Sequence, residues 1–345
     1  MCYHPMLGIK YLDRINFETG KNVVKVLPRT EVVKWEGQVF SRNDFDRVER
    51  VEIPCGKCID CRLNYSKQWA YRCMDEASQW SKNYFVTLTY APENLPLRDY
   101  VDRETGEILT TSTLVPDHVS QFMKKLRRSM DYHLGVDSGV RFFCAGEYGE
   151  QYSRPHYHAI LFNCPLPDVK PWFKKDGFQH YHSDFLQDVW GNGICSVEDV
   201  TYQSAAYVAR YVVKKQKGPN AKDYYASIGK EPEFVRMSRA PGIGREWYEQ
   251  HKDELYKYDG KTYNVGPGKT VRAKPAKYYD KLFDIDNPEM MRHIKEVRLK
   301  AIEATISEIR SKTSLEKGDY NKAQEALALA RTKILQSRNN FYSNV

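Results

Sequence analysis

Hydrophobic and polar residues alternate over several short stretches of the chain, and a period of two predicts β-strands. The clearest stretches cover residues 84–90, 141–147 and 156–162. A turn at residues 149–155, which contains glycine and proline, joins the second stretch to the third and predicts an antiparallel hairpin. Shorter apolar stretches at residues 23–27 and 32–35 indicate further strands near the N-terminus.

Apolar residues recur every three or four positions in other segments, and this spacing predicts amphipathic helices. The predicted helices cover residues 64–80, 116–130, 183–190 and 203–217. Ser183 is a suitable N-cap for the third helix. The second helix carries Lys124, Lys125, Arg127 and Arg128 on its polar face. We interpret that face as solvated, with DNA contact as the alternative.

Two apolar stripes at helical spacing also mark the C-terminal region. They are formed by Leu299, Ile302, Ile306 and Ile309, and by Ala323, Leu327, Ala330 and Ile334. The polar segment Lys317-Gly318-Asp319 separates them. The pattern predicts a C-terminal helical hairpin of two antiparallel helices.

Strands interrupted by helices in this order predict an α+β fold with a central antiparallel sheet layered with helices. We expect an N-terminal segment at residues 1–80 with a cysteine cluster and a helix. A sheet-bearing domain at residues 81–217 follows, with a polar loop or hairpin at residues 98–113. Residues 218–284 are rich in glycine, tyrosine and charge and are expected to form an irregular linker region, and residues 285–345 to form the helical hairpin.

The composition is that of a globular protein with a mildly basic surface. The 345 residues suggest about two domains, and the mean hydropathy of −0.67 goes with 41% hydrophobic residues. No stretch of about 18 apolar residues and no secretory signal is found, so we expect no membrane association and a cytoplasmic location. The net charge of +8 suits a polyanion, and 25 tyrosines supply rings on which single-stranded bases can stack.

Two His-x-His pairs occur in the chain. His156 and His158 fall on a predicted strand, where a period of two turns both rings to one side. His180 and His182 precede the Ser183 cap, where we expect the backbone to change direction and no apolar face to support them. The first pair is therefore the preferred metal site.

Two neutral imidazoles need a carboxylate to complete a site for a divalent ion beside phosphate. Glu147 ends the neighbouring strand and is the expected ligand, with Glu150 as the reserve candidate. Mg²⁺ or Mn²⁺ is the expected ion. The alternative is a strand with two structural histidines and no metal.

Tyr207 and Tyr211 are four residues apart on a predicted helix and therefore share one face. The opposite face consists of Ala205, Val208, Ala209 and Val212. A phenol becomes a good nucleophile only when cations stabilise its phenolate, and Lys214 and Lys215 follow Tyr211 at helical distance. The alternative is a pair of tyrosines at the boundary of the core.

Eight cysteines without a secretory signal do not indicate disulfides. Cys55, Cys58 and Cys61 supply three thiolates, and a tetrahedral zinc ion needs a fourth ligand. Cys2 is the expected fourth ligand and His4 the next candidate, whereas Cys73 lies on an apolar helix stripe and is expected to be buried. An iron–sulfur cluster and free reduced cysteines stay open as alternatives to zinc. Cys144, Cys164 and Cys195 are expected to be packing residues.

Four segments together resemble the HUH endonucleases, and more closely the replication initiators of gokushovirus-type microviruses, which are small single-stranded DNA phages. The segments are Arg154-Pro155-His156-Tyr157-His158-Ala159-Ile160-Leu161-Phe162, Tyr207-Val208-Ala209-Arg210-Tyr211-Val212-Val213-Lys214-Lys215, Phe85-Val86-Thr87-Leu88-Thr89-Tyr90 and Cys55-Gly56-Lys57-Cys58-Ile59-Asp60-Cys61-Arg62. The resemblance runs from about residue 55 to 215, with weaker similarity at residues 2–5 and 237–244. Tyr157 stands where the family name implies an aliphatic residue.

The resemblance implies a metal-dependent, site-specific DNA endonuclease and ligase with an HUH nuclease domain at residues 81–217. It implies that Glu147 is the acidic metal ligand and that Lys214 is the lysine of the nucleophile motif. Such an enzyme nicks one strand at a phage origin through a phosphotyrosine and rejoins it during rolling-circle replication. The DNA is single-stranded or supercoiled and circular, and the reaction takes place in the host bacterial cytoplasm.

The sequence contains no phosphate-binding glycine-rich loop, so a host helicase is expected to act with the protein, together with a host polymerase. An HUH transposase or relaxase would use the same chemistry on other DNA. A zinc-containing single-stranded DNA-binding protein without enzymatic activity is the alternative from another class.

Overall fold

The computed structural model describes residues 2–16, 21–27, 48–135, 139–149, 151–175, 177–214 and 220–339. The chain divides into two compact units. One comprises Met1–Arg62 and Ser314–Ser337, and the other comprises Leu63–Thr313 and Arg338–Val345. The α+β class expected from the sequence is confirmed. The four segments expected from the sequence, with limits at residues 80, 217 and 284, stay a prediction.

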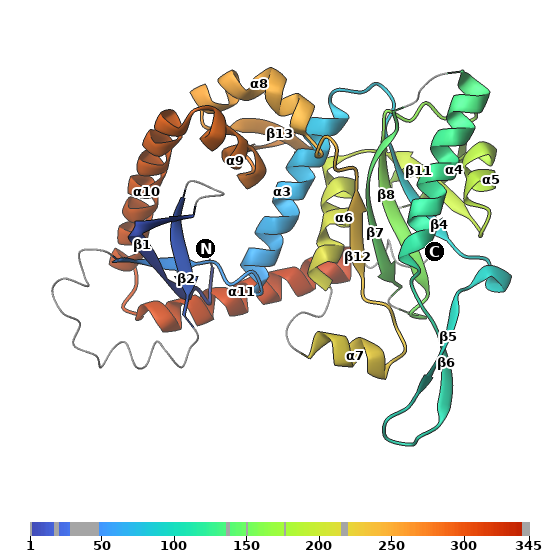
Figure 1. The fold of residues 1–345 in the computed structure, drawn as a ribbon, viewed down its shortest axis with the longest axis horizontal. Helices are drawn as coiled ribbons and strands as arrows, with labels where there is room; N and C mark the ends of the chain where they lie inside the picture. The colour runs from blue at the N-terminus through green and yellow to red at the C-terminus, as the bar shows by residue number, and fades with distance from the viewer. Residues whose placement is uncertain are drawn as a thin grey trace. The chain divides into compact units, whose positions relative to one another are not determined.

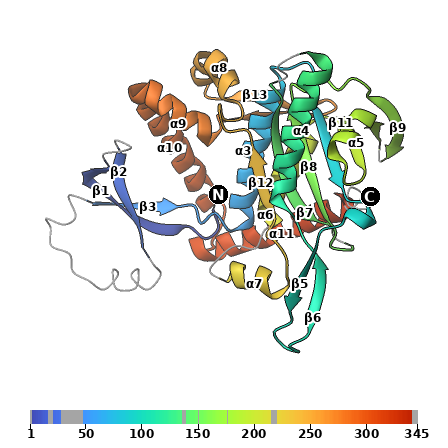
Figure 2. The ribbon, with the colours of Figure 1, turned by 45° about the vertical axis from the view of Figure 1, so that its right-hand side comes forward.

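A large antiparallel sheet forms the centre of the second unit (Figure 1). Its strands, in spatial order, are β12 (Phe234–Met237), β7 (Arg141–Tyr148), β8 (Pro155–Phe162), β4 (Tyr84–Thr89), β11 (Cys195–Asp199), β10 (Phe178–His182) and β9 (Lys170–Lys175). Every neighbouring pair in the sheet is antiparallel. The expected hairpin of residues 141–147 and 156–162 is therefore confirmed as β7–β8. Figure 2 shows β9 at one edge of the sheet.

Helices cover both faces of the sheet, because alternate residues of each strand are apolar on opposite sides. One face packs against α4 (Pro116–Leu134) and α5 (Asp184–Trp190), and its core includes Tyr157 and Leu161 of β8. The other face packs against α6 (Tyr202–Lys214) and α3 (Ile59–Ala77), and its core includes Ile160 and Phe162. Figure 1 shows α4 and α6 on opposite sides of the sheet. The alternation along β8 thus divides one strand between two cores.

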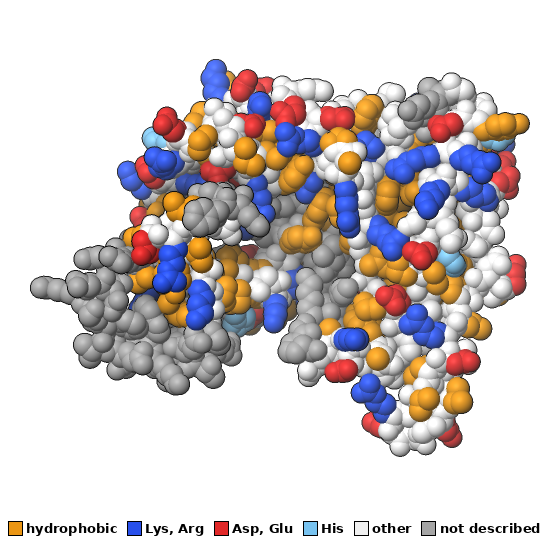
Figure 3. All heavy atoms as spheres, viewed as in Figure 1, with side chains coloured by type: hydrophobic (Ala, Val, Ile, Leu, Met, Phe, Trp, Pro, Cys, Tyr) orange, Lys and Arg blue, Asp and Glu red, His pale blue; other side chains and the backbone are white. Residues whose placement is uncertain are grey.

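The predicted caps delimit the helices on the first face. Pro116 lies in the first turn of α4, and Gly135 ends the helix in the left-handed region with a φ of 62°. The Ser183 hydroxyl accepts a hydrogen bond of 3.1 Å from the Leu186 N–H at the start of α5, as the sequence predicts. Basic side chains gather over α4 in the view of Figure 3. The exposed residues among them are Lys124, Lys125 and Arg128.

Residues 97–112 form a hairpin of β5 (Leu97–Val101) and β6 (Ile108–Ser112), which decides between the loop and the hairpin considered for this stretch. The helix expected at residues 64–80 is α3, which begins five residues earlier than expected and ends at Ala77. The helix expected at residues 203–217 is α6, which the structure describes as far as Lys214.

The expected irregular linker at residues 218–284 is wrong, because most of this region is regular. It contains α7 (Ala221–Ser227), β12, α8 (Arg245–Lys257), β13 (Lys261–Gly266), β14 (Lys269–Ala273) and α9 (Lys277–Asp286). The buried carboxyl of Asp75 in α3 accepts hydrogen bonds from the hydroxyls of Tyr263 and Tyr279, at 3.0 and 2.9 Å. These tyrosines are buried by partners distant in sequence, so a local pattern of polar and apolar residues misclassifies them.

The first unit contains a three-stranded antiparallel sheet of β1 (Met6–Asn16), β2 (Lys21–Val26) and β3 (Val48–Ile53), with β1 in the middle. The strand expected at residues 23–27 corresponds to β2, and the one expected at residues 32–35 lies outside the described residues. The same unit contains most of α11 (Lys317–Asn339), where Asn321 donates to the Tyr3 carbonyl.

The two helices expected in the C-terminal region are present as α10 (Pro288–Ser311) and α11. Their pairing as an antiparallel hairpin stays a prediction. None of the helices in the described ranges has both the length and the apolar composition that a membrane span requires.

Candidate functional site

Glu147, His156 and His158 meet on the β7–β8 hairpin. Glu147 and His156 are direct partners across the ladder, and His158 is the next residue of β8 on the same side. The Nε2 atoms of His156 and His158 lie 2.8 and 2.9 Å from the same Glu147 oxygen, Oε1. The two rings are perpendicular, with centroids 4.9 Å apart. The hairpin therefore brings the three residues proposed from the sequence to one point.

The partners of the two Nδ1 atoms determine what the Nε2 atoms present to Glu147. His156 Nδ1 lies 3.2 Å from the Arg154 carbonyl oxygen, which can only accept, so this nitrogen carries a proton. His158 Nδ1 lies 3.0 Å from Thr87 Oγ1. When the rings are neutral and protonated on Nδ1, both Nε2 lone pairs face a carboxylate oxygen. A positive charge, either on the rings or as a bound cation, is then needed between them.

This donor set fits a divalent ion. Neutral imidazole nitrogens and one carboxylate bind first-row divalent metals, and the ligand atoms of the three residues lie within 4.8 Å of one another. The hydrogen bonds to Arg154 and Thr87 hold the rings with Nε2 directed to the carboxylate, which is the usual second layer of a histidine metal site.

Glu147 is buried, and burial alone would raise the pKa of its carboxyl. The hydrogen bonds from His156 and His158 and the positive charge of their protonated rings outweigh burial and lower the pKa of Glu147 to about 2. The carboxylate is therefore ionised at neutral pH, as a metal ligand has to be.

Tyr207 of α6 lies against His158. Their ring centroids are 5.0 Å apart at an interplanar angle of 83°, and Phe85 stacks on the same imidazole at 5.5 Å. The packing face expected for this helix is buried at Ala205, Val208 and Ala209. Because those residues fill the core against the sheet, the helix holds the Tyr207 ring beside the histidine strand.

Tyr211 and Lys214 belong to α6 by their backbone, and their side chains lie outside the described part of the structure. Glu150, the reserve metal ligand, and Lys215 also lie outside it. Arg210 has its guanidinium carbon 5.9 Å from the centroid of the Tyr207 ring, so one described cation lies near this phenol.

The second histidine pair has a different setting from the one expected. His180 and His182 lie on strand β10, and His180 is buried and stacks on Phe173 with centroids 4.4 Å apart. The expectation that no apolar face supports this pair is wrong, because β9 supplies the packing partner. His180 Nδ1 lies 3.3 Å from Glu198 Oε1, and His182 Nε2 lies 2.9 Å from Asp184 Oδ1. The two histidines thus have separate carboxylate partners instead of a shared one.

Sequence reasoning assigned no role to Thr87 or Arg154, which orient the two imidazoles. Thr87 pairs directly with His158 across β4 and β8, so its hydroxyl is on the same side of the sheet as the imidazole. The polar alternation of residues 87 and 89 within a buried strand was the available signal. Arg154 acts through its carbonyl, and no residue-type pattern predicts a contact of the main chain.

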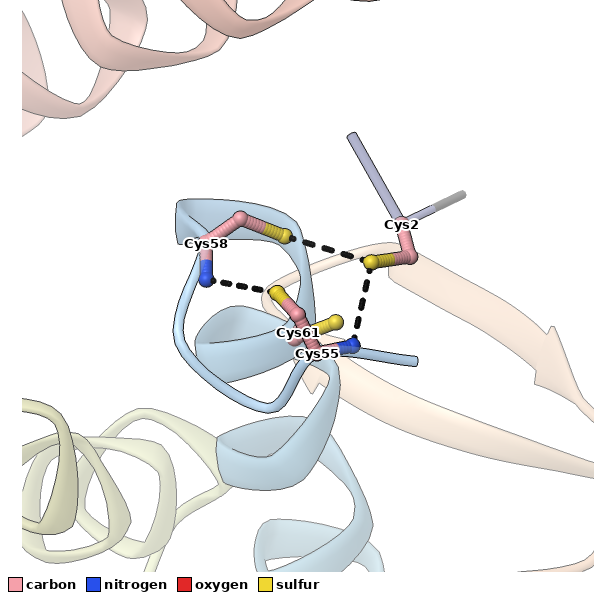
Figure 4. A group of neighbouring side chains, drawn as sticks. All are labelled: Cys2, Cys55, Cys58 and Cys61. Atoms are coloured by element: carbon pink, nitrogen blue, oxygen red, sulfur yellow. Dashed lines mark hydrogen bonds between the residues drawn. The ribbon is translucent and has the colours of Figure 1, made fainter. Parts of the chain in front are cut away.

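The four cysteines proposed from the sequence also lie together, within the first unit (Figure 4). The sulfur atoms of Cys2, Cys55, Cys58 and Cys61 lie within 4.8 Å of one another, and Cys2 Sγ is 3.9 Å from Cys58 Sγ. The alternative fourth ligand, His4, is directed to Glu325 instead, with Nε2 2.5 Å from Oε2. The structure therefore assembles four thiols without His4.

Backbone N–H groups donate to the sulfurs of this cluster, as they do to thiolates. Cys58 N and Lys57 N lie 3.2 and 3.4 Å from Cys55 Sγ, and Cys55 N lies 3.2 Å from Cys2 Sγ. Burial would raise the pKa of Cys55, but these bonds lower it to about 7. Burial raises the pKa of Cys61 to about 12. Four thiols with such different acidities are a group that a bound cation would bring to one ionised state.

The remaining cysteines are packing residues, as expected from the sequence. Cys73 is fully buried on α3, and Cys144, Cys164 and Cys195 are buried in the core of the second unit. Burial raises the pKa of each of these four thiols. Their chemistry is therefore that of small apolar side chains.

Comparison with known proteins identifies relatives among phage proteins. The chain is 33% identical over 272 residues to Replication-associated protein ORF2 of Spiroplasma virus 4, covering 78% of this chain and 79% of that protein. It is 31% identical over 256 residues to Replication-associated protein VP4 of Bdellovibrio phage phiMH2K, covering 73% and 74%. It is 32% identical over 206 residues to Replication-associated protein ORF4 of Chlamydia phage 1, covering 56% and 47%.

The family model of the ORF2-type replication-associated proteins matches residues 83–216, which include the β7–β8 hairpin and α6. No solved structure matches the chain significantly. The resemblance inferred from the sequence is confirmed by these relatives. The chain belongs to the family of phage replication-associated proteins and is related to the rolling-circle initiators of microviruses.

Proposed function

We propose that this protein nicks one DNA strand at a phage origin through a phosphotyrosine intermediate and later rejoins that strand during rolling-circle replication. The observation that supports this most is the position of Tyr207, whose ring lies 5.0 Å from the His158 ring in the convergent Glu147, His156 and His158 group. A nucleophile beside a cation site is the arrangement that phosphodiester transfer needs.

Glu147, His156 and His158 would hold Mg²⁺ or Mn²⁺ in this scheme. The bound ion would polarise a phosphate oxygen and neutralise charge that develops on the phosphate. The chain itself supplies the orientation: Arg154 and Thr87 fix the rings, and the buried Glu147 remains ionised.

In the cleavage step a phenol oxygen of Tyr207 or Tyr211 attacks the scissile phosphorus. A tyrosine–phosphorus bond forms on the 5′ side of the cut, the bond from phosphorus to the 3′ oxygen breaks, and that oxygen takes up a proton to become a free hydroxyl. The phenol proton leaves to solvent or to a neighbouring base. Arg210 beside Tyr207, and Lys214 at the motif position, would stabilise the phenolate.

Rejoining is the reverse reaction, in which a 3′ hydroxyl attacks the phosphotyrosine and releases the phenol. The bond energy is conserved in the covalent intermediate, so no nucleotide cofactor is required. Two phenols four residues apart on α6 would allow one to cut a regenerated origin while the other still holds the first end.

The proposed partners follow from the reaction. The substrate is origin DNA, single-stranded or supercoiled, in the host bacterial cytoplasm. The free 3′ hydroxyl can prime a host polymerase. The sequence lacks a phosphate-binding loop, so strand separation is assigned to a host helicase.

We propose further that Cys2, Cys55, Cys58 and Cys61 bind one structural zinc ion. Four sulfurs within 4.8 Å match a tetrahedral Cys₄ site, and N–H groups already point to two of them. The ion would tie the N-terminal residues to the start of α3.

The nicking function is tested by incubating the protein with phage replicative-form DNA and Mg²⁺. We expect conversion of supercoiled circles to nicked circles at one position, with protein attached to the 5′ end. Chelation should stop the reaction. Binding to single-stranded DNA without any nick or adduct would favour the non-enzymatic binding protein, and cleavage at sites outside a replication origin would favour a transposase or relaxase.

A further inference from the structure

The face of the sheet that carries His158 continues outward to the edge strands β10 and β9. Tyr181 of β10 pairs with Val197 and packs in the core on the α4 side, so His180 and His182 face the opposite side. On that side Glu198 of β11 pairs with Phe85, and Phe85 pairs with Ile160 of β8. Residues of β10 and of the histidine strand therefore share one face of the sheet.

Three strand steps separate β8 from β10 along this face. At about 4.8 Å per step, the distance from the histidine strand to β10 is about 14 Å. Helix α6 packs on β7, β8 and β12, which are at the other side of the sheet from β9 and β10.

Aromatic rings gather at this edge. Phe173 stacks on His180 with centroids 4.4 Å apart, and Trp172 lies against His182 at 5.6 Å. Trp172 is 50% exposed although it is the largest type of apolar side chain. The rings of Trp172, Phe173, His180 and His182 form what we call the edge platform. An exposed indole on a supporting layer of rings is a surface on which a nucleic acid base can stack.

The charges around the edge platform are mostly positive. Strand β9 contributes Lys170, Lys174 and Lys175, of which Lys170 and Lys174 are exposed. The acidic residues nearby are Asp184, which contacts Lys170 at 3.5 Å and His182, and Glu198, which is buried next to His180. Cations interleaved with stacking rings are complementary to the phosphates and bases of a single strand.

We propose that the edge platform binds the single-stranded DNA that flanks the scissile phosphate, with a base stacked on Trp172 and phosphates near Lys170 and Lys175. This proposal rests on the proposed nicking function, since the face is shared with the Glu147, His156 and His158 group. Stacking does not distinguish bases strongly, so the platform contributes affinity and positions the strand, and sequence choice resides elsewhere.

The test is equilibrium binding of a labelled single-stranded origin oligonucleotide in the presence of a chelator, so that no cleavage occurs. Trp172→Ala should weaken binding about 10-fold, as expected for loss of one stacked base. Trp172→Tyr, which keeps a ring, should bind almost as well as the wild-type protein. Tyr132→Ala is the matched control, because Tyr132 is 83% exposed on α4 at the opposite face of the sheet and should be neutral.

Unchanged affinity of Trp172→Ala, or an equal loss in Tyr132→Ala, would overturn the proposal. An equal loss for a blunt duplex would replace the single strand by double-stranded DNA as the occupant and would also overturn it. Adduct formation with Mg²⁺ is measured separately. If the wild-type protein forms no adduct but Trp172→Ala still binds the single strand weakly, nicking fails and the platform stands. If the adduct forms and Trp172→Ala binds normally, the platform fails and nicking stands.

Discussion

The hydroxyl oxygens of Tyr90 and Tyr157 lie 2.7 Å apart in the core directly beneath the histidine strand. Tyr157 is the residue between His156 and His158, and its side chain points to the opposite face of β8. Its hydroxyl donates to the Val115 carbonyl at 3.0 Å and accepts from the Val115 N–H at 3.1 Å. A tyrosine is therefore accommodated where an aliphatic residue was expected, because the polar end of its ring is fully hydrogen-bonded.

We predict that Tyr157→Phe destabilises the fold by about 1–3 kcal/mol, because the Val115 N–H and the Tyr90 hydroxyl each lose a hydrogen-bond partner in the core. Looser anchoring of β8 should also raise the Mn²⁺ concentration needed for half-maximal nicking. Denaturant unfolding and a metal titration of nicking measure the two effects. Tyr132→Phe, at an exposed position, is the control, and equal behaviour of the two variants would contradict the prediction.

Replacement of His156 or His158 by Ala should abolish nicking and leave DNA affinity nearly unchanged. The imidazoles act on the scissile phosphate through the metal site, whereas affinity comes mostly from Lys and Arg contacts with other phosphates. Glu147→Ala should lose activity that high Mn²⁺ partly restores. His133→Ala, at an exposed histidine of α4, serves as control. Loss of nicking in His180→Ala and His182→Ala, with His156 dispensable, would show that the other pair is the metal site.

Tyr207→Phe and Tyr211→Phe should each still form some covalent adduct with a single-stranded origin oligonucleotide, because either phenol on α6 can attack. Neither should complete a full round of cleavage and rejoining, and the double variant should form no adduct. Peptide mapping of the adduct identifies the attacking residue. Tyr152→Phe changes an exposed tyrosine and should behave as wild type. Adduct in the double variant would remove α6 from catalysis.

Purified protein should contain about one equivalent of zinc bound by the four-cysteine cluster. Cys2→Ala should lower the metal content, since the four sulfurs lie within 4.8 Å and three thiolates leave one zinc position open. Cys164→Ala, at a buried cysteine of the second unit, should keep it. Elemental analysis measures both variants. Less than about half an equivalent of zinc in the wild type, with folding unchanged after chelation, contradicts the zinc site, and iron in its place identifies the alternative cluster.

Glu198 predicts a pH dependence of stability outside the metal site. Burial, followed by the charge of Asp199, raises the pKa of its carboxyl from 4.5 to about 7, although Lys175 opposes the shift. A raised pKa means that the folded state binds the proton more tightly, so this stability is complete below about pH 4.5 and is lost as the pH rises through 7.

Glu198→Gln should therefore become more stable relative to the wild type between pH 5 and pH 8, by an amount on the order of 2–3 kcal/mol at most. Denaturant unfolding at several pH values measures the difference. Asp188→Asn, which changes an exposed carboxylate of α5, is the control. A stability difference that stays constant with pH would show that Glu198 titrates normally in the folded protein.

Much of the candidate site was determined by local sequence pattern. The period of two in residues 156–162 places His156 and His158 on one side of a strand, and the turn before it makes the neighbouring strand antiparallel, so Glu147 arrives opposite His156. The helical spacing around Tyr207 and the three clustered cysteines are equally local. These features depend on backbone geometry that extends over a few residues, so their outcome can be derived without the rest of the chain.

The remaining features depended on tertiary structure. The contact between Tyr207 and His158, the choice of Cys2 over His4, and the packing of His180 on Phe173 each join segments whose meeting is decided by sheet order and core packing. The regular structure at residues 218–284 was missed for the same reason, because buried tyrosines that donate to Asp75 look like surface residues in the sequence. A local pattern reports the period of a segment, whereas only the folded chain decides which partner satisfies each polar group.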